Sequence, residues 1–305
     1  MKGIIRISCI IFFTIFQLQA ADEFLPKVKR ILFLGDSITY DGKYVGYFNA
    51  YLISNFPDRN FEVINVGLAS ETVSGLSEPN HAGGKFPRPD LHERLDRVLT
   101  KIKPDLVFAC YGMNDGIYLP LAEDRFDAFK NGMKKLRQKV EANNAKIIHI
   151  TPPNFDLGPK AAAGTPDYND VLGAYSKWLL EQKKDGWNVI DLHGPMTKEL
   201  ADQRAQNPSF VFASDRVHPN AAGHWIFTRE ILRGLNQNTD DISTDPRYSN
   251  LIKLSYDHMQ ILRDAWLTET GHNRPGVRKG LPIAEAQTKA ATLETEMKQT
   301  APKLK

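Results

Sequence analysis

Five short runs of apolar residues recur along the chain and predict buried strands. Each run is rich in Ile, Val, Leu or Phe and is bounded by turn residues. Between these runs lie segments whose apolar residues follow helical spacing. The predicted strands are residues 30–34, 61–66, 105–111, 146–151 and 187–192, and the predicted helices are residues 44–56, 91–102, 125–143, 168–183 and 220–235.

This alternation of strand and helix predicts an α/β fold, with a parallel sheet covered by helices on both faces. Right-handed crossovers favour an open, doubly wound arrangement. In such sheets the functional site lies beyond the carboxyl ends of the strands. Ser37 follows the first predicted strand, Ser70 the second and Asn114 the third. We therefore expect these three residues at one edge of the sheet.

The pattern changes after the last of these helices. Residues 237–245 are polar and predict a linker, and residues 248–267 and 283–298 predict two helices joined by a Gly/Pro-rich turn. We therefore expect a main domain over residues 21–236 and a helical extension over residues 237–305. The apolar residues of the first helix need a packing partner. That partner is either this chain or a second copy, in which case the C-terminal helices would form a homodimer.

The first 20 residues have the pattern of an export signal. Lys2 and Arg6 form a positive region just before an apolar run, residues 7–16, and Ala20 offers a small residue for cleavage. The run is too short to span a membrane comfortably, and an uncleaved anchor is the alternative. We expect an exported protein, periplasmic or extracellular, with no membrane span after cleavage.

Composition narrows the choice of function further. The 305 residues are 42% hydrophobic and 25% charged, which is ordinary for a globular protein. The formal net charge is only +3, so no basic surface to attract nucleic acid is expected. Cleavage of the signal would remove Cys9, so no intramolecular disulfide is expected in the mature chain. Cys110 lies inside an apolar run, which predicts a buried, unreactive thiol. The sequence has neither a P-loop nor a dinucleotide-binding glycine motif.

Ser37 completes the sequence Gly-Asp-Ser at the end of an apolar run. A free serine hydroxyl is a poor nucleophile at neutral pH and needs a base. His218 is the candidate base, and Asp215 lies three residues before it, close enough to hold Nδ1 and leave Nε2 facing the serine. Taken alone, this spacing is typical of a capping aspartate beside a surface histidine. Together with the serine, it predicts nucleophilic catalysis.

Catalysis of this kind also needs hydrogen-bond donors for the negative charge that develops on the substrate oxygen. Asn114 is the candidate side-chain donor, and the backbone N–H groups of Ser37 and Ser70 are further candidates. The alternative for Asn114 is an ordinary turn residue at a strand end. Asp36 is expected to organise the turn around Ser37 by accepting local backbone N–H groups.

Other polar and aromatic residues fall near the same edge. Asp191 and His193 form a second Asp/His pair, which we interpret as structural because no serine block accompanies it. His81 and Arg88 lie in the loop 77–89, where sugar contacts and solvation are the alternatives. Four tyrosines could stack on sugar rings or pack in the core. They are Tyr40, Tyr44, Tyr111 and Tyr118.

Four polar blocks follow one another along the chain, at residues 35–39, 65–72, 112–115 and 215–218. In content and order they resemble the SGNH (GDSL-type) hydrolase superfamily, over roughly residues 29–235. The resemblance implies a flavodoxin-like, three-layer α/β/α fold with sheet order 2-1-3-4-5. It also implies a serine esterase mechanism without a metal or cofactor. The roles of nucleophile, oxyanion donor and remaining triad members would belong to Ser37, Asn114, and Asp215 with His218.

One position departs from that family's pattern. The family usually has a glycine as oxyanion donor after the second strand, whereas alignment on Asn65 places Ser70 there. The donor is a backbone N–H, so a serine can supply it where φ and ψ suit a residue with a Cβ atom. If the register is shifted, Gly67 would be the donor instead.

These features predict an exported serine esterase that removes a short acyl group, acetyl foremost, from a carbohydrate through an acyl-serine intermediate. The alternatives within the enzyme class are a lysophospholipase or lipase, and an acyltransferase. A non-catalytic carbohydrate-binding protein on a hydrolase fold is the alternative from a different class. The expected partner is a small-molecule or polysaccharide ester, with no nucleic acid, no metal and no cofactor.

Overall fold

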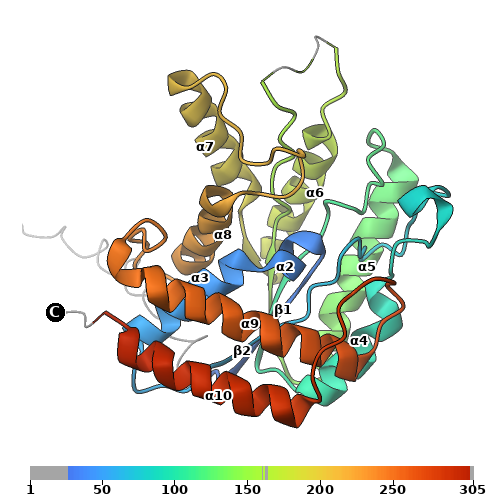
Figure 1. The fold of residues 1–305 in the computed structure, drawn as a ribbon. Coiled ribbons are helices and arrows are strands. Elements are labelled where there is room, and N and C mark those ends of the chain that lie inside the picture. The colour runs from blue at the N-terminus through green and yellow to red at the C-terminus, as the bar shows by residue number, and fades with distance from the viewer. Residues whose placement is uncertain (1–26, 160, 162–163, 303–305) are drawn as a thin grey trace, which may run out of the picture.

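The computed structural model describes residues 27–159, 161 and 164–302, and its centre is a five-stranded parallel sheet of order β2-β1-β3-β4-β5 (Figure 1). The strands are β1 (Arg30–Gly35), β2 (Glu62–Asn65), β3 (Leu106–Cys110), β4 (Lys146–Ile150) and β5 (Asn188–Ile190). The α/β class and the sheet order are confirmed. The helices are α2 (Ser37–Asp41), α3 (Lys43–Asn55), η1 (His81–Gly84), α4 (Leu91–Ile102), α5 (Glu123–Ala142), α6 (Asn169–Glu181), η2 (Gln182–Asp185), α7 (His193–Gln206), α8 (Ala221–Gly234), η3 (Pro246–Tyr248), α9 (Ser249–Thr270) and α10 (Ile283–Thr300).

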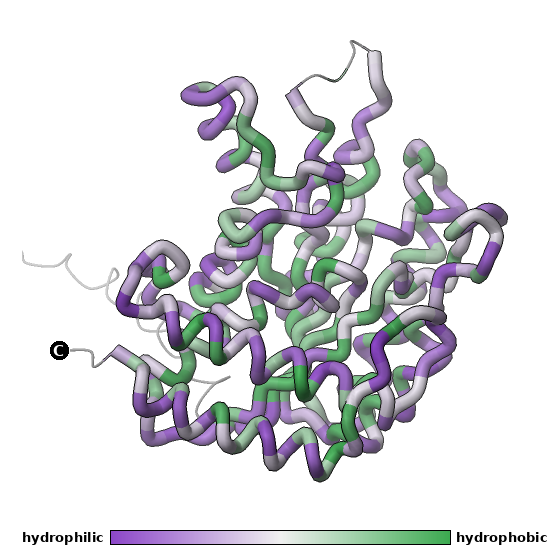
Figure 2. Tube along the Cα trace, in the orientation of Figure 1, coloured by the Kyte–Doolittle hydropathy of each residue, from purple (hydrophilic) through white to green (hydrophobic). Residues whose placement is uncertain are grey.

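Helices cover both faces of the sheet. On one face α3 contacts α8, and on the other α4 contacts α5, which reaches α6 through the stacked rings of Phe129 and Tyr175. Phe33 of β1 lies at the centre, stacked on Phe108 of β3 and edge-on to Phe48 of α3. Figure 2 shows hydrophobic positions concentrated where the helices meet the sheet. This burial of apolar surface on both faces is the main stabilising contribution to the sheet.

A short helix, α2, begins at Ser37 and was not predicted. Asp36 caps it, because its carboxylate accepts the N–H of Ile38 at 2.9 Å, as expected for the turn around the serine. Gly42 ends the helix with a φ of 71°, and a Cβ atom there would lie 2.5 Å from Asn65 Nδ2. A glycine is therefore required at this position. Ser37 is held between a buried strand and this capped helix.

The C-terminal hairpin predicted from the sequence is present as α9 and α10. The apolar side of α9 is buried within this chain, against α3, β2 and α10. Helix α10 packs on α9 through the buried residues Ala286, Ala290 and Met297. The packing partner of α9 is thus the chain itself, and the homodimer remains a prediction.

The export signal predicted for residues 1–20 lies outside the described residues. Over the ranges that the structure describes, no helix combines the length and the apolar character needed to cross a bilayer. Cys110 is buried, as predicted, and burial raises the pKa of its thiol well above the ordinary value.

Strand β4 carries a completely buried histidine, His149, whose ring centroid lies 4.6 Å from that of Trp187. Neither ring nitrogen has a hydrogen-bond partner in the described part of the chain. Burial lowers the pKa of His149 from 6.5 to about 3. The unfolded chain therefore binds this proton first as the pH falls, and the folded state loses stability between pH 6.5 and about pH 3.

Replacing His149 with phenylalanine removes this titration and keeps a ring against Trp187. Between pH 7 and pH 4.5, the wild type should lose about 2–3 kcal/mol of unfolding free energy relative to the variant. Urea unfolding of both proteins at several pH values measures this difference. Asp36 and Asp115 are present in both proteins, so their contributions to the pH dependence of stability cancel in this difference. Their raised pKa values have the opposite effect to that of His149. Parallel curves for the two proteins would contradict the prediction.

Candidate active site

Ser37, His218 and Asp215 are joined by hydrogen bonds beyond the carboxyl end of β1. His218 Nε2 lies 2.7 Å from Ser37 Oγ, and His218 Nδ1 lies 2.6 Å from Asp215 Oδ2. A proton on Nδ1, held by the carboxylate, leaves the Nε2 lone pair facing the hydroxyl. In that tautomer the imidazole can accept the serine proton, which is what activation of a serine requires.

The Asp215 carboxylate is fixed by its own turn. Its Oδ1 accepts the N–H groups of Val217 at 3.0 Å and His218 at 2.8 Å. Partial burial raises the pKa of Asp215, but its hydrogen bonds to the backbone and imidazole of His218 outweigh this effect, and the net pKa is lowered. The carboxylate therefore remains ionised at neutral pH, the state that stabilises an imidazolium.

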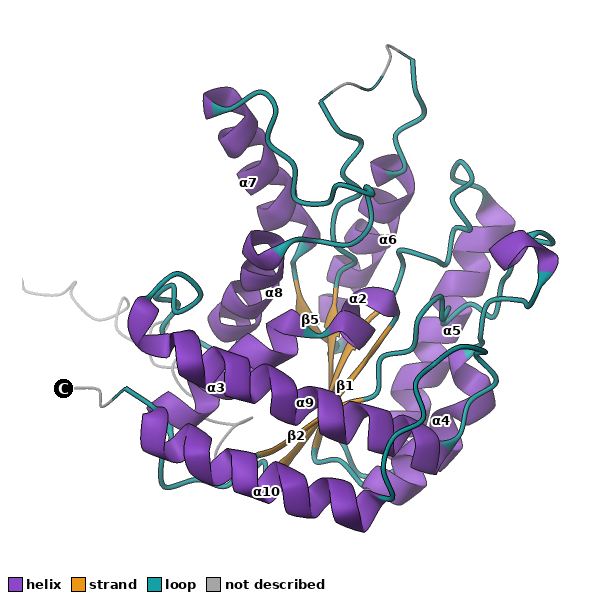
Figure 3. Ribbon diagram, viewed as in Figure 1, coloured by secondary structure: helices purple, strands orange, loops and turns teal. Residues whose placement is uncertain are grey.

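The site is open to solvent. The side chains of His218 and Asp215 are 46% and 55% exposed. The loops that leave the sheet at the α2 end are long, as Figure 3 shows. Because the side chains of His218 and Asp215 are this exposed, a group attached to a large molecule can approach them from solvent.

A buried carboxylate from the loop after β4 supports the segment that carries Asp215. Asp156 accepts the N–H of Phe212 at 2.7 Å and the guanidinium of Arg204, and its own N–H donates to the carbonyl of Arg216 at 2.9 Å. Arg216 adopts a left-handed φ of 75° between the two catalytic candidates. Sequence reasoning missed Asp156, although its place after β4 puts it at the same edge of the sheet.

Ser70 adopts a φ of 68°, the left-handed conformation that favours glycine. Ser70 has a Cβ atom, yet its backbone has the conformation expected at the position where the resemblance implies a glycine. The alternative donor, Gly67, already donates its N–H to Asn65 Oδ1 at 2.8 Å. A Cβ atom at Gly67 would lie 2.5 Å from the backbone nitrogen of Tyr40, so close packing explains this glycine. Ser70 thus remains the backbone candidate in this loop.

Asn114 is buried, and its neighbours orient its amide group. Its Oδ1 accepts Arg88 Nη1 at 2.9 Å and the hydroxyl of Tyr118 at 3.2 Å, whereas its Nδ2 donates to the carbonyl of Glu71 at 3.2 Å. Turning the amide over would place donor against donor at Arg88. The carbonyl of Glu71 uses one N–H of Nδ2, which leaves the second as a candidate donor to a substrate oxygen.

A buried ion pair holds the loop after β2, which carries Ser70. Glu71 accepts Arg94 Nε at 2.6 Å and Nη2 at 2.8 Å, and it also accepts the hydroxyl of Tyr111 at 2.7 Å. Burial raises the pKa of the Glu71 carboxyl, and Arg94 opposes this rise. Sequence reasoning missed this pair, because only the fold brings α4 against the loop.

Asp115 ties the loop after β2 to the loop after β3. Its Oδ1 accepts the N–H of Val73 at 2.9 Å and that of Ser74 at 2.8 Å. Burial raises the pKa of Asp115 to about 6. Asp36 is also buried, and its pKa is raised to about 7. Both carboxyls serve to shape the loops, because their hydrogen bonds go to backbone N–H groups around the candidate donors.

The remaining residues considered above have structural contacts. Arg88 is buried and bonds Glu78 as well as Asn114, so it is neither solvated nor free for a sugar. Asp191 accepts the hydroxyl of Thr151 at 3.2 Å, consistent with the structural interpretation of its pair with His193. His81 bonds Glu78 through Nδ1 at 3.1 Å. Two of the tyrosines are buried in the core and cannot stack on a sugar. They are Tyr44 and Tyr111.

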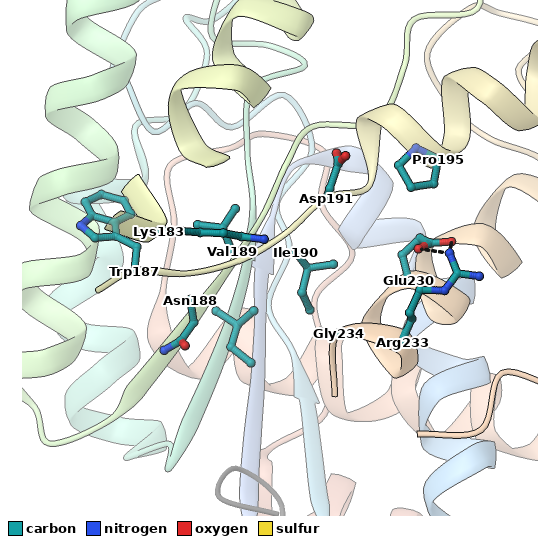
Figure 4. Close-up of a pocket in the computed structure, with 11 residues that line it drawn as sticks. Lys183, Trp187, Asn188, Val189, Ile190, Asp191, Pro195, Glu230, Arg233 and Gly234 are labelled. Carbon is teal, nitrogen blue, oxygen red and sulfur yellow. Dashed lines mark hydrogen bonds and ion pairs between the residues drawn. The ribbon is translucent and has the colours of Figure 1, made fainter. Parts of the chain in front are cut away.

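A cavity of about 540 Å³ lies along β5, apart from Ser37 (Figure 4). Its lining comes from β5 and the neighbouring helices, and includes Trp187, Asp191 and the ion pair of Glu230 with Arg233. This hollow marks the open edge of the sheet. None of the residues lining this cavity is Ser37, His218 or Asp215, and we place the candidate site at Ser37 because its geometry suits chemistry.

Known proteins resemble this chain in sequence and in fold. The GDSL-like lipase/acylhydrolase family matches residues 33–226. An acetylxylan esterase from Geobacillus stearothermophilus is 25% identical over 226 residues, which are 67% of this chain and 93% of that protein. A crystal structure of an acetylxylan esterase from the same organism has a TM-score of 0.54 at 22% identity, covering 70% of this chain and 97% of that one.

Other solved structures extend the likeness in fold. A gut microbial diltiazem-metabolizing enzyme has a TM-score of 0.52 at 20% identity, covering 69% of this chain but only 48% of that one. Three catalytic mutants of the Geobacillus esterase replace a serine, an aspartate and a histidine with alanine, the last two being three positions apart.

The family match spans more than half of the chain, and the fold and sheet order agree with it. The chain belongs to the GDSL-like lipase/acylhydrolase family.

Proposed function

We propose that this protein is an exported serine esterase that removes short acyl groups, acetyl foremost, from carbohydrate. The observation that carries the proposal is the hydrogen-bonded chain from Ser37 through His218 to Asp215. Two further observations support it. The relative from Geobacillus is an acetylxylan esterase, and its catalytic mutants include an aspartate and a histidine with the spacing of Asp215 and His218.

In the proposed reaction, Ser37 Oγ attacks the ester carbonyl carbon while His218 Nε2 takes the hydroxyl proton. The carbonyl oxygen becomes an oxyanion, which accepts hydrogen bonds from Asn114 Nδ2 and the N–H groups of Ser37 and Ser70. The imidazolium then gives its proton to the leaving sugar oxygen as the ester C–O bond breaks. Water attacks the acyl-serine, His218 takes a proton from it, and Ser37 Oγ leaves with that proton as acetate is released.

A lipase-type activity is the second candidate, because apolar side chains lie exposed in the loop after Asn114. Tyr118, Leu119 and Leu121 are 37%, 45% and 47% exposed. Such a surface near the site could bind a longer acyl chain. This loop directly follows Asn114 in the sequence. An acyl chain bound there would therefore extend from the side of the site that carries this oxyanion donor.

A chain-length series of p-nitrophenyl esters, with acetate release from a panel of acetylated polysaccharides, tests the proposal. The wild type should turn over the acetyl ester fastest and release acetate from at least one polysaccharide. Fastest turnover of octanoyl or longer esters would instead support the lipase. Ligand binding without turnover of any ester would support the non-catalytic alternative.

Replacing Asn114 with alanine should lower kcat for p-nitrophenyl acetate by about 10²–10³-fold, with KM nearly unchanged, because the lost donor acts on charge that develops only in the transition state. Steady-state kinetics measure both constants. The matched control is Asn143→Ala, which should leave kcat unchanged. Asn143 follows α5 and precedes β4, so it lies at the amino ends of the parallel strands, opposite the edge that carries this site. An Asn114→Ala protein with wild-type kcat would remove the side-chain donor from the mechanism.

A further inference from the structure

The C-terminal extension contacts α2 and the loop after β2, the two segments that carry the candidate backbone donors Ser37 and Ser70. The family match ends at residue 226, so η3, α9 and α10 lie beyond it. In Figure 1, α9 runs beside α3 and past the end of the sheet where β2 lies, and it contacts both elements. Its position brings side chains of the extension to α2, the helix that begins at Ser37.

Arg263 of α9 reaches the end of that helix. Its Nη1 donates to the carbonyl of Tyr40 at 2.6 Å, and its guanidinium lies 4.1 Å from the centre of the Tyr40 ring. Arg263 is 6% exposed, and the neighbouring Asp264 balances its charge at 2.8 Å. The last carbonyls of a helix have no partner within it, and a cation at this end is favourable. Arg263 therefore supplies a partner for the Tyr40 carbonyl, beside the N–H of Gly42, which caps the carbonyl of Ile38.

Two more contacts from α9 strengthen this attachment. The hydroxyl of Tyr256 donates to Asp41 Oδ1 at 3.1 Å, at the last residue of α2. Met259 Sδ lies 3.3 Å from Asn65 Nδ2, which donates to the carbonyl of Thr39 at 2.6 Å. Groups that come from, or pack against, the extension thus hold the carboxyl end of α2 together with Lys43 and His224, which both bond Asp41.

Arg274, in the loop between α9 and α10, reaches the other donor. Its Nε donates to the carbonyl of Ala69 at 3.3 Å, and its guanidinium lies 4.5 Å from the centre of the Phe86 ring. Ala69 directly precedes Ser70, whose left-handed φ of 68° is unfavourable for a residue with a Cβ atom. A hydrogen bond to the preceding carbonyl restrains the peptide group whose N–H belongs to Ser70.

We infer that Arg263 and Arg274 are positioning residues, through which the C-terminal extension holds the Ser37 and Ser70 N–H groups in place for the oxyanion. The inference rests on the proposed esterase function. An oxyanion hole works only if its donors are held before the charge develops, and small displacements of a reacting group are costly in rate. The extension would then contribute to catalysis by positioning the oxyanion donors.

Arg274→Met is the first test, because this side chain is only half-buried and its loss should leave the fold intact. We expect kcat for p-nitrophenyl acetate to fall about 10-fold or more, with KM unchanged within experimental error. The matched control is Arg247→Met, which removes an exposed arginine from the same extension and should keep wild-type kcat. A purely structural role would lower the melting temperature and leave kcat of the folded protein unchanged.

Arg263→Lys is the second test. It keeps a positive charge beside Asp264 but loses the planar group that stacks on Tyr40 and bonds its carbonyl. We again expect a fall in kcat of about 10-fold, measured well below the unfolding temperature. Wild-type kcat in both folded variants, beside an active wild type, would overturn this inference alone. A wild type without serine-dependent turnover would overturn the proposed function and this inference with it.

Discussion

Replacing Ser37 with alanine is expected to lower kcat for p-nitrophenyl acetate by about 10⁵–10⁶-fold. The reason is that the variant cannot form the acyl-serine, so any remaining hydrolysis needs direct attack by water. His218 and Asp215 would still be hydrogen-bonded to each other, but Nε2 would have no hydroxyl to deprotonate. Steady-state kinetics with p-nitrophenyl acetate, and acetate release from polysaccharide, measure the loss.

The fold should survive this change, because only one oxygen atom at the start of α2 is lost. Circular dichroism and the urea midpoint of Ser37→Ala should match those of the wild type. Ser209→Ala, at an exposed serine between α7 and α8, is the matched control and should keep full activity. Mass spectrometry of wild-type protein quenched during turnover should find the acyl group on Ser37. Undiminished hydrolysis by a pure Ser37→Ala protein would refute the serine mechanism.

Arg94→Met is expected to have the largest effect on stability, lowering the unfolding free energy by about 3–5 kcal/mol. The change removes the cation that faces Glu71 at 2.6 Å, and both side chains are at most 1% exposed. An unpaired carboxylate would then remain buried beneath the loop of Ser70. Urea unfolding at neutral pH measures the loss, and Lys101→Met, which breaks an exposed pair on the same helix, should cost at most about 1 kcal/mol.

The pH dependence of the Arg94→Met protein gives a second, independent test. Burial already raises the pKa of Glu71, and the variant lacks the arginine that opposes this rise. A carboxyl whose folded-state pKa is raised contributes stability at low pH and loses it as the pH rises through that pKa. The variant should therefore recover stability relative to wild type as the pH is lowered from 8 to 5. A constant difference across this range would show that Glu71 is not the group left unpaired.

Most elements of the main domain could be predicted from the sequence, because the buried strands are continuous apolar runs and the helices carry apolar residues at helical spacing. The helix Leu91–Ile102 matches the predicted range at both ends. Helix α2 was missed because its five residues are too few for any period to appear. Helix α7 was missed because only Met196 and Leu200 in it are buried, so its apolar signal is weak.

The side chains that support the site could not be predicted in the same way. Arg88 bonds Asn114 across 26 positions, and Arg94 bonds Glu71 across 23. A charged residue in a loop or on a helix usually faces solvent, and nothing in its immediate neighbours marks it as buried. These arginines are buried because the fold supplies a carboxylate or an amide oxygen where each one ends.

Local features could be inferred from neighbouring residues alone: the buried strands, the turn in which Asp215 holds the N–H and imidazole of His218, and the polar blocks at the strand ends. A hydrogen bond across three residues needs only the turn that those residues form. Tertiary structure alone decided the rest. The bond from His218 to Ser37 joins residues 181 positions apart, and that from Arg263 to Tyr40 joins residues 223 apart. Such contacts exist only because burial of the apolar sheet and helix faces brings distant segments together, and that burial is a property of the whole chain.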